Sequence, residues 1–219
     1  MVTSPADMNT LPVEVAILAK APVAGLAKTR LIPAVGAVGA ARLHRRLVLR
    51  TLAVVAQAGL VPTLWCAPSP AHRFFRALRS TALLACQPQV EGDIGQRMHA
   101  VFVQHARRST APLLLIGCDC PVFSASHLRL AAQRLLWGDE AVLTPAEDGG
   151  YVLIGLKQPQ ATLFEGLAWS TSEVMAQTRQ KLHAAGLRYS EMPTLWDVDT
   201  PQDLARWQAM AADPAESSA

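Results

Sequence analysis

The 219-residue chain has few of the features that mark a secreted, membrane-bound or nucleic-acid-binding protein. No apolar run approaches the length of a membrane span, and residues 1–11 contain Pro5 and Asp7 without the apolar core of a secretory signal. The net charge is only +3, from 20 Lys plus Arg and 17 Asp plus Glu. That balance disfavours a general nucleic-acid binder and fits a small anionic ligand. We expect a cytoplasmic protein without membrane or nucleic-acid partners.

Several catalytic and metal-binding patterns are also missing. The four cysteines, at positions 66, 86, 118 and 120, have no C-x-x-C spacing, which favours buried reduced thiols over zinc ligands. The six histidines include no H-E-x-x-H motif, and none pairs with a serine or cysteine as in a hydrolase. A hydrolase triad therefore has no support in the sequence.

Charged residues make up 17% of the chain and hydrophobic residues 51%, which indicates one compact domain, predicted over residues 12–210 with flexible termini at 1–11 and 211–219. Apolar runs of strand length alternate with helical patterns. The predicted strands are 13–19, 61–67, 82–86, 113–117, 141–144, 151–156 and 187–192, and the predicted helices are 39–58, 71–79, 93–108, 124–136, 172–185 and 201–210. This rhythm predicts a three-layer αβα fold with a mostly parallel central sheet.

The most informative segment is the loop after the first predicted strand, which carries Lys20, Gly25, Lys28 and Arg30. Loops at the carboxyl end of a central strand bind ligands in open α/β sheets, and clustered cations on a glycine-relieved backbone suit a polyphosphate. The loop is not a Walker A motif, because Ala27 stands where that motif has its glycine before the lysine. We interpret it as a nucleotide phosphate loop of another kind. Solvated surface charge is the alternative.

Carboxylates near two other strand ends could hold a metal. Asp119 ends a buried strand, and the next predicted helix begins at Ser124, too far away for Asp119 to be its N-cap. Near the C-terminus, helix capping accounts for Thr200, Pro201 and Asp203 but leaves Asp197 and Asp199 unexplained. Magnesium prefers one or two carboxylates together with water and phosphate oxygens. We therefore predict a Mg²⁺ (or Mn²⁺) site on Asp119, Asp197 and Asp199, with Lys28 and Asp119 as the catalytic pair.

Three further segments have both a structural and a functional interpretation. Gly92 and Asp93 can form a helix start, with Asp93 as the N-cap, or they can bind a nucleotide together with Arg97. The sequence Asp148-Gly149-Gly150-Tyr151 can be a hairpin turn or a close approach of backbone to substrate. Before another helix stand Trp169, Ser170 and Thr171, where either hydroxyl can be an N-cap or the segment can bind the acceptor.

Taken in order, these motifs resemble the DUF2064 family of glycosyltransferase-A-like transferases. The motifs are K-A-P-x-x-G-x-x-K-T-R-L from Lys20, G-D-I-G-x-R-M from Gly92, G-C-D-C-P from Gly117, D-G-G-Y-x-L-I-G from Asp148, W-S-T from Trp169 and D-V-D-T-P from Asp197. The resemblance implies the Rossmann-like (GT-A) fold of nucleotide-diphospho-sugar transferases. It also implies kinship with 2-phospholactate guanylyltransferase and molybdenum-cofactor nucleotidyltransferases, and the use of a nucleotide with a divalent metal.

The resemblance implies that the basic loop binds the triphosphate. It also implies that Asp119 and Asp199 are the two metal ligands. One departure is that glycosyltransferases of this fold carry D-x-D after the central strand, whereas this chain has Cys118-Asp119-Cys120. We therefore expect nucleotidyl transfer from an NTP to a small acceptor, with pyrophosphate release. Glycosyl transfer from an NDP-sugar is the first alternative and a noncatalytic nucleotide-binding module the second.

Overall fold

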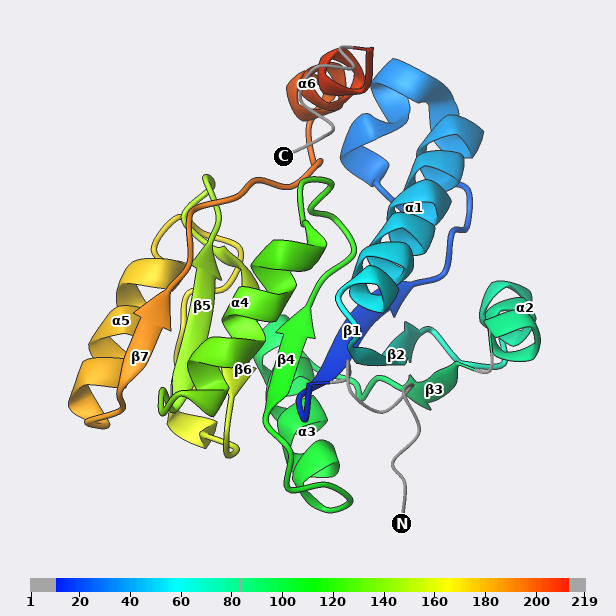
Figure 1. The fold of residues 1–219 in the computed structure, drawn as a ribbon. Helices are drawn as coiled ribbons and strands as arrows, with labels where there is room; N and C mark the ends of the chain where they lie inside the picture. The colour runs from blue at the N-terminus through cyan, green and yellow to red at the C-terminus, as the bar shows by residue number, and fades with distance from the viewer. Residues whose placement is uncertain (1–10, 83, 213–219) are drawn as a thin grey trace.

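A seven-stranded sheet organises the chain in the computed structural model, which describes residues 11–82 and 84–212 (Figure 1). The strand order is β3-β2-β1-β4-β6-β5-β7. Strand β6 is antiparallel to both of its neighbours, and the remaining pairs are parallel. The strands are β1 (Glu14–Lys20), β2 (Val61–Ala67), β3 (Ala85–Pro88), β4 (Leu113–Ile116), β5 (Ala141–Pro145), β6 (Tyr151–Leu156) and β7 (Tyr189–Glu191). The mostly parallel αβα prediction is confirmed.

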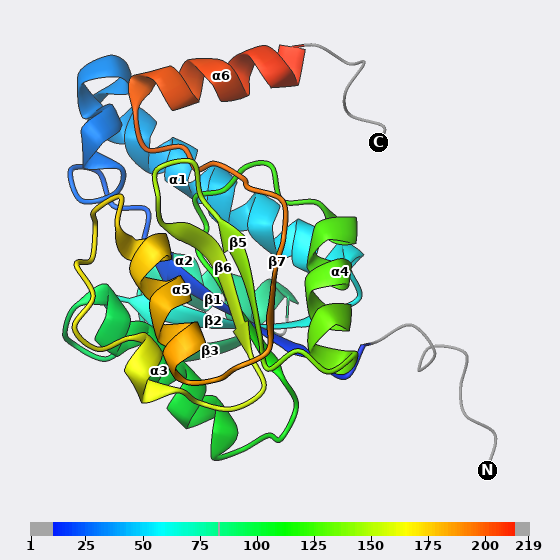
Figure 2. The same cartoon turned by 90° about the vertical axis from the view of Figure 1, so that its left-hand side faces the viewer.

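Helices cover both faces of the sheet, as the edge-on view in Figure 2 shows. The long helices are α1 (Ile32–Gln57), α2 (Arg73–Ala82), α3 (Ile94–Ala106), α4 (Ala125–Leu136), α5 (Val174–Ala184) and α6 (Pro201–Ala212), with short 3₁₀ turns η2 (Thr29–Leu31) and η3 (Ala161–Leu163). None of the helices in the described residues combines the length and the apolar character needed to cross a bilayer.

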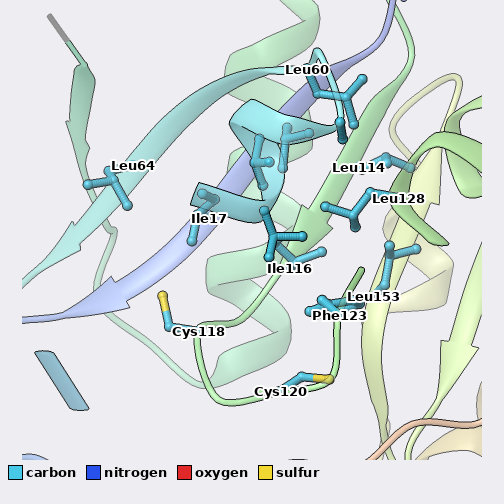
Figure 3. Packing of buried hydrophobic residues seen from close by; sticks show 14 of the residues in the cluster. Ile17, Leu60, Leu64, Leu114, Ile116, Cys118, Cys120, Phe123, Leu128 and Leu153 are labelled. Carbon is cyan, nitrogen blue, oxygen red and sulfur yellow. The ribbon is translucent and has the colours of Figure 1, made fainter. Parts of the chain in front are cut away.

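Two apolar layers account for the stability of this arrangement. One face of the sheet packs on α1 and α4 through residues such as Ile17, Leu114 and Leu128 (Figure 3). The other face packs on α3, α5 and η3 through residues such as Phe102 and Leu182. Because the central strands are buried on both faces, their sequences are continuously apolar rather than alternating.

The element boundaries correct the sequence prediction in two places. The first long helix begins at Ile32, not at residue 39, because Pro33 fits a first helical turn; the helix is broken at Gly36, where φ is 70° and ψ 163°. The third strand is Ala85–Pro88 instead of 82–86, since α2 continues to Ala82. Helix α6 runs to Ala212, and the rest of the predicted flexible termini lies outside the described residues apart from Leu11.

A third apolar cluster attaches the C-terminal segment to the start of the chain. Leu31, Leu43 and Leu47 pack against Trp196, Val198 and Leu204. The guanidinium of Arg46 also lies 5.0 Å from the ring centre of Trp207. In Figure 1 helix α6 accordingly lies beside the beginning of α1, beyond the carboxyl end of β1. This contact brings the 197–199 segment to the loop that follows β1.

Candidate active site

Lys28 is the centre of the site. It precedes η2 in the left-handed conformation, with φ 50° and ψ 48°, which costs a non-glycine residue about 1–2 kcal/mol. The side chain is only 6% exposed, and its ammonium lies 2.9 Å from Asp119 Oδ1 and 2.8 Å from Asp199 Oδ1. Lys28 Nζ also donates a hydrogen bond to the carbonyl of Val198 at 2.7 Å. Three distant segments therefore meet at one cation.

The two carboxylates reach Lys28 from different elements. Asp119 follows β4, and Asp199 precedes α6. The Asp203 carboxylate caps the start of α6 by accepting hydrogen bonds from the amides of Asp199 and Thr200 at 3.1 and 2.7 Å. Thr200 Oγ1 in turn accepts from the amide of Asp203, so the predicted cap is confirmed. This cap fixes the backbone that carries Asp199.

Electrostatics at the site favour a charged lysine. Burial alone would lower the pKa of Lys28, but attraction to Asp119 and Asp199 outweighs it and raises that pKa above its usual value. Burial followed by repulsion from Asp199 raises the pKa of Asp197 to about 6. Arg30 adds a distant contact, with Nη1 3.7 Å from Asp199 Oδ2, and its side chain is 74% exposed. An exposed guanidinium beside a buried ammonium suits an anion arriving from solvent.

A cavity of about 330 Å³ opens beside Asp119 at the carboxyl ends of the central strands. Its polar lining includes Lys20, His44, Gln89, Arg97 and Asp119, and its apolar lining includes Ile94, Met98 and Tyr151. Arg97 is oriented by the hydrogen bond that its Nε donates to the carbonyl of Gly92 at 2.9 Å. The cavity therefore combines apolar walls with cationic groups, as pockets for small anionic molecules do.

The glycines and the aspartate predicted to bind nucleotide have a largely structural account. Gly25 has a φ of 82° and open space around the position of a Cβ. Gly92, with φ 119°, precedes Asp93, the N-cap of α3. Asp93 and Gln96 form a reciprocal capping box, so the capping interpretation of Asp93 is confirmed.

The Asp148–Tyr151 segment is a turn between β5 and β6, held by a 2.9 Å hydrogen bond from the Gly150 amide to Asp148 Oδ1. A Cβ on Gly149 would lie 2.2 Å from the carbonyl oxygen of Ser172. The close backbone approach seen at Gly149 is therefore to the chain's own 167–173 segment. Tyr151 lines the cavity.

Trp169 packs on the start of α3, where a Cβ on Gly95 would lie 2.4 Å from the indole Nε1. Its ring also meets Tyr151 edge-on, with 6.4 Å between centroids. The N-cap predicted at Ser170 or Thr171 is wrong, because α5 begins at Val174 with Glu173 as its N-cap. The Thr171 hydroxyl instead belongs to a turn before the helix: it donates to the carbonyl of Ala168 at 2.7 Å and accepts from the amide of Glu173 at 3.3 Å.

His44, which none of the sequence motifs contains, lines the cavity from α1. Its Nε2 lies 2.8 Å from the carbonyl oxygen of Lys20, and its Nδ1 lies 3.8 Å from Asp119 Oδ1. Burial lowers the pKa of His44 below its usual value, which favours the neutral ring. Helical spacing could have indicated that His44 is buried, because it lies one helical turn before Val48, on the buried side of α1.

The carboxylates of Asp119 and Asp199 suit a divalent cation whose remaining ligands come from water and substrate. Within residues 11–82 and 84–212, no three His, Cys, Asp or Glu side chains converge as a metal cage. Asp119 Oδ1 is buried and lies 2.9 Å from the Lys28 ammonium. Magnesium is commonly bound by one or two carboxylates plus water and phosphate. Two carboxylates, of which Asp119 lines the cavity, fit that donor set, whereas a permanent cage is absent from the described residues.

The four cysteines are free, as predicted, although Cys86 is only half-buried.

The fold brings six of the predicted site residues to one edge of the sheet. The ion pairs of Lys28 join it to Asp119 and Asp199, and the cavity is lined by Lys20, Arg97, Asp119 and Tyr151.

Solved structures with the same fold include several nucleotide-utilising transferases. A candidate nucleotide-diphospho-sugar transferase from Desulfovibrio desulfuricans G20 is 26% identical, with a TM-score of 0.85 over 93% of this chain and 89% of that one. The inositol-1-phosphate CTP transferase from T. maritima is 12% identical, with a TM-score of 0.60 over 93% and 96% of the two chains. CMP:2-keto-3-deoxy-manno-octonic acid synthetase, solved with CTP, is 14% identical, with a TM-score of 0.56 over 91% and 98%.

Relatives under 25% identical show the fold alone, and no curated protein matches the chain. The family model described as "Uncharacterized protein conserved in bacteria (DUF2064)" matches residues 51–171, more than half of the chain. The likeness to transferases supports a nucleotide-utilising transferase. Because the family model covers more than half of its residues, the chain belongs to the DUF2064 family.

Proposed function

We propose that this protein is a divalent-metal-dependent nucleotidyltransferase, which joins the nucleoside monophosphate part of an NTP to a small acceptor and releases pyrophosphate. The observation that carries the proposal is the position of Lys28 Nζ, within 2.9 Å of Asp119 Oδ1 and 2.8 Å of Asp199 Oδ1. A single ammonium between two carboxylates, next to a basic loop and a cavity, is suited to a polyphosphate and its cation.

The residues of the chain would divide the work as follows. The cations of the first loop, Lys20, Lys28 and Arg30, would bind and orient the phosphates. Asp119 and Asp199 would hold the cation, with Asp197 beside them. When bound, Mg²⁺ or Mn²⁺ supplies charge neutralisation at the phosphate oxygens. Phosphoryl-type transfers require mainly positioning and electrostatic stabilisation, so the site needs no protein nucleophile.

The acceptor would lie in the cavity against Tyr151 and Trp169, next to the Asp148–Gly150 turn. The cavity is lined by Tyr151, and Trp169 packs against both Tyr151 and the start of α3. A rigid aromatic wall that meets cationic groups suits a small organic molecule with an anionic or hydroxyl group.

Glycosyl transfer from an NDP-sugar is the second candidate, favoured by the name of the Desulfovibrio desulfuricans relative. The single carboxylate at Cys118-Asp119-Cys120 favours nucleotidyl transfer instead, as does the density of cations on the first loop. The two reactions differ in product: nucleotidyl transfer releases pyrophosphate, whereas glycosyl transfer leaves the nucleoside diphosphate intact.

The test is a thermal-shift panel of NTPs and NDP-sugars, with and without Mg²⁺ or Mn²⁺, followed by assay of pyrophosphate release with the stabilising nucleotide. A ligand at a hundredfold its dissociation constant stabilises the fold by about 2.7 kcal/mol. We expect a metal-dependent shift with an NTP, lost in Asp119→Asn and retained in the exposed control Glu165→Gln. A shift with NDP-sugars alone, or no NTP-dependent shift, would reject nucleotidyl transfer.

A further inference from the structure

Lys28 is bound, in this structure, to the two residues that the proposed function separates from it. In the proposed function its ammonium binds phosphate, while Asp119 and Asp199 bind the divalent cation. Here Nζ lies 2.9 Å from Asp119 Oδ1 and 2.8 Å from Asp199 Oδ1. The ammonium and the two carboxylates therefore have to change partners when metal and nucleotide bind.

The ammonium of Lys28 has oxygen neighbours of the kind that hard divalent cations prefer. Besides the two carboxylate oxygens, the carbonyl oxygen of Val198 lies 2.7 Å from Nζ. Carboxylate and carbonyl oxygens are also ligands of such cations. An ammonium has three N–H donors, as many as the oxygens around it, and the Lys28 side chain is only 6% exposed. In this position it is not available to an anion in solvent.

A divalent cation and this ammonium would repel each other. An ion bound to either Oδ1 at about 2.1 Å would lie no more than about 5 Å from Nζ. Like charges at that distance repel strongly where burial limits screening by water. The Asp119 and Asp199 side chains are 43% and 38% exposed, so a cation in solvent can reach them. The ammonium, rather than access, therefore limits binding of a metal on its own.

The balance of charge favours an exchange once a polyphosphate is present. One ammonium leaves one negative charge of the two carboxylates uncompensated, whereas a divalent cation compensates both. In the part of the chain that the structure describes, no other lysine or arginine is paired with two carboxylates. A polyphosphate would give the displaced ammonium new anionic oxygens.

Lys28 can change partners through its side chain alone. The four-carbon stem of lysine is flexible, and its ammonium binds as a point charge without a fixed planar geometry. Lys20 and Arg30 stand on either side of Lys28 in the same loop. Lys20 lines the cavity, and the Arg30 side chain is 74% exposed. Phosphates bound by these two cations would lie next to the Lys28 segment.

We propose that Lys28 is an internal cation that keeps a divalent metal off Asp119 and Asp199 until a polyphosphate draws its ammonium away. Metal and nucleotide then bind together, and metal alone binds weakly. The inference rests on the proposed function for the ligands of each group and adds how their binding is coupled. Because such coupling is reciprocal, the metal tightens nucleotide binding by the factor by which the nucleotide tightens metal binding.

The experiment titrates the full chain with MnCl₂ alone and measures bound Mn²⁺ by EPR. Lys28→Met removes the ammonium and keeps an unbranched side chain. Lys28→Gln is the second variant, because its amide can still donate to the Val198 carbonyl. Arg30→Gln is the matched control, since it removes a positive charge 3.7 Å from Asp199 Oδ2 that does not stand between the two carboxylates. Thermal melts check that each variant folds.

We expect weak Mn²⁺ binding by the wild type and by Arg30→Gln, and binding at least about tenfold tighter in both Lys28 variants. Equal binding by the wild type and the Lys28 variants, or no binding by any of them, would overturn the inference. An equal gain in Arg30→Gln would do the same, because the effect would then come from net charge and not from the position of the ammonium.

A second measurement tests the release of Lys28 in the wild type. Inorganic tripolyphosphate serves as the probe, since it has the phosphate chain of an NTP without the base. MnCl₂ should raise the melting temperature of the wild type only with tripolyphosphate present, and that of Lys28→Met without it. A wild type stabilised by MnCl₂ alone, or not stabilised by the two together, would contradict the exchange. The Mn²⁺ titrations contain no nucleotide, so their outcome is separate from the NTP shift that tests the proposed function.

Discussion

Lys28 Nζ lies 2.8 Å from Asp199 Oδ1, although the two residues are 171 positions apart in the chain. The same ammonium is 2.9 Å from Asp119 Oδ1, so it joins the first loop, the end of β4 and the approach to α6. The ammonium compensates the repulsion between the two carboxylates. Lys28 therefore serves both the stability of this edge of the fold and the proposed binding of phosphate.

Replacement of Lys28 by Met should affect stability and nucleotide binding together. The change leaves Asp119 and Asp199 facing each other without the ammonium, and we expect a loss of about 1–3 kcal/mol, moderated because both carboxylates are partly exposed. Urea denaturation measures the loss, and the NTP-dependent thermal shift should disappear. The control Lys157→Met, at a half-buried lysine after β6, is not expected to change that shift. An equal NTP shift in Lys28→Met would contradict this role of Lys28.

Asp203→Ala should weaken metal-dependent nucleotide binding although Asp203 is not one of the proposed metal or phosphate ligands. Asp203 Oδ2 accepts hydrogen bonds from the amides of Asp199 and Thr200, so its removal takes away one half of the reciprocal cap at the start of α6. Loss of an N-cap interaction of this kind costs about 0.5–2 kcal/mol. We expect a lower melting temperature and weaker metal-dependent NTP binding, because the backbone that carries Asp199 is less fixed.

The control for this prediction is Asp203→Asn, which retains an oxygen able to accept from the same amides. It should recover most of the lost stability and affinity. Similar losses in both variants would mean that the charge of Asp203, rather than its cap, is what the site requires.

Gly149→Ala should be strongly destabilising, because a Cβ there would lie 2.2 Å from the Ser172 carbonyl oxygen at a φ of 89°. Gly166 also has a positive φ, 65°, but has open space around its Cβ position, so Gly166→Ala isolates the backbone strain. We expect about 1–2 kcal/mol for Gly166→Ala and at least about 1 kcal/mol more for Gly149→Ala, measured by urea denaturation. Equal losses would show that the contact with Ser172 relaxes freely.

His127 should give the unfolding free energy a measurable pH dependence. Burial lowers the pKa of His127, whose Nε2 is 2.8 Å from the Thr144 hydroxyl. The folded state therefore favours the neutral ring, so this contribution is fully present above about pH 6.5 and is lost as the pH falls towards the lowered pKa. Between pH 7.5 and 5.5 the wild type should lose more stability than His127→Gln. Parallel curves would contradict this assignment.

Local sequence signals predicted correctly the strands that carry the site residues at their carboxyl ends. The apolar run before Lys20 and the run before Asp119 are both strands of a parallel sheet, so the residues that follow them meet at the same edge. The capping pattern at Thr200 and Asp203 was equally readable, because it depends on residues within one helical turn. The start of α5 could not be read from the W-S-T segment in the same way. The Thr171 hydroxyl bonds to the carbonyl of Ala168 in the preceding turn, and α5 begins only at Val174.

The sequence by itself determined the strand and helix order, the basic loop and the carboxylates at the strand ends, because these depend on apolar periodicity and on residues close together in the chain. Only the tertiary structure decided that Lys28 stands between Asp119 and Asp199, that Gly149 packs on Ser172, and that the ring of His44 lies beside Asp119. These contacts arise where α1, β4 and the segment before α6 pack together. Their distances are set by long-range packing, which no local pattern encodes.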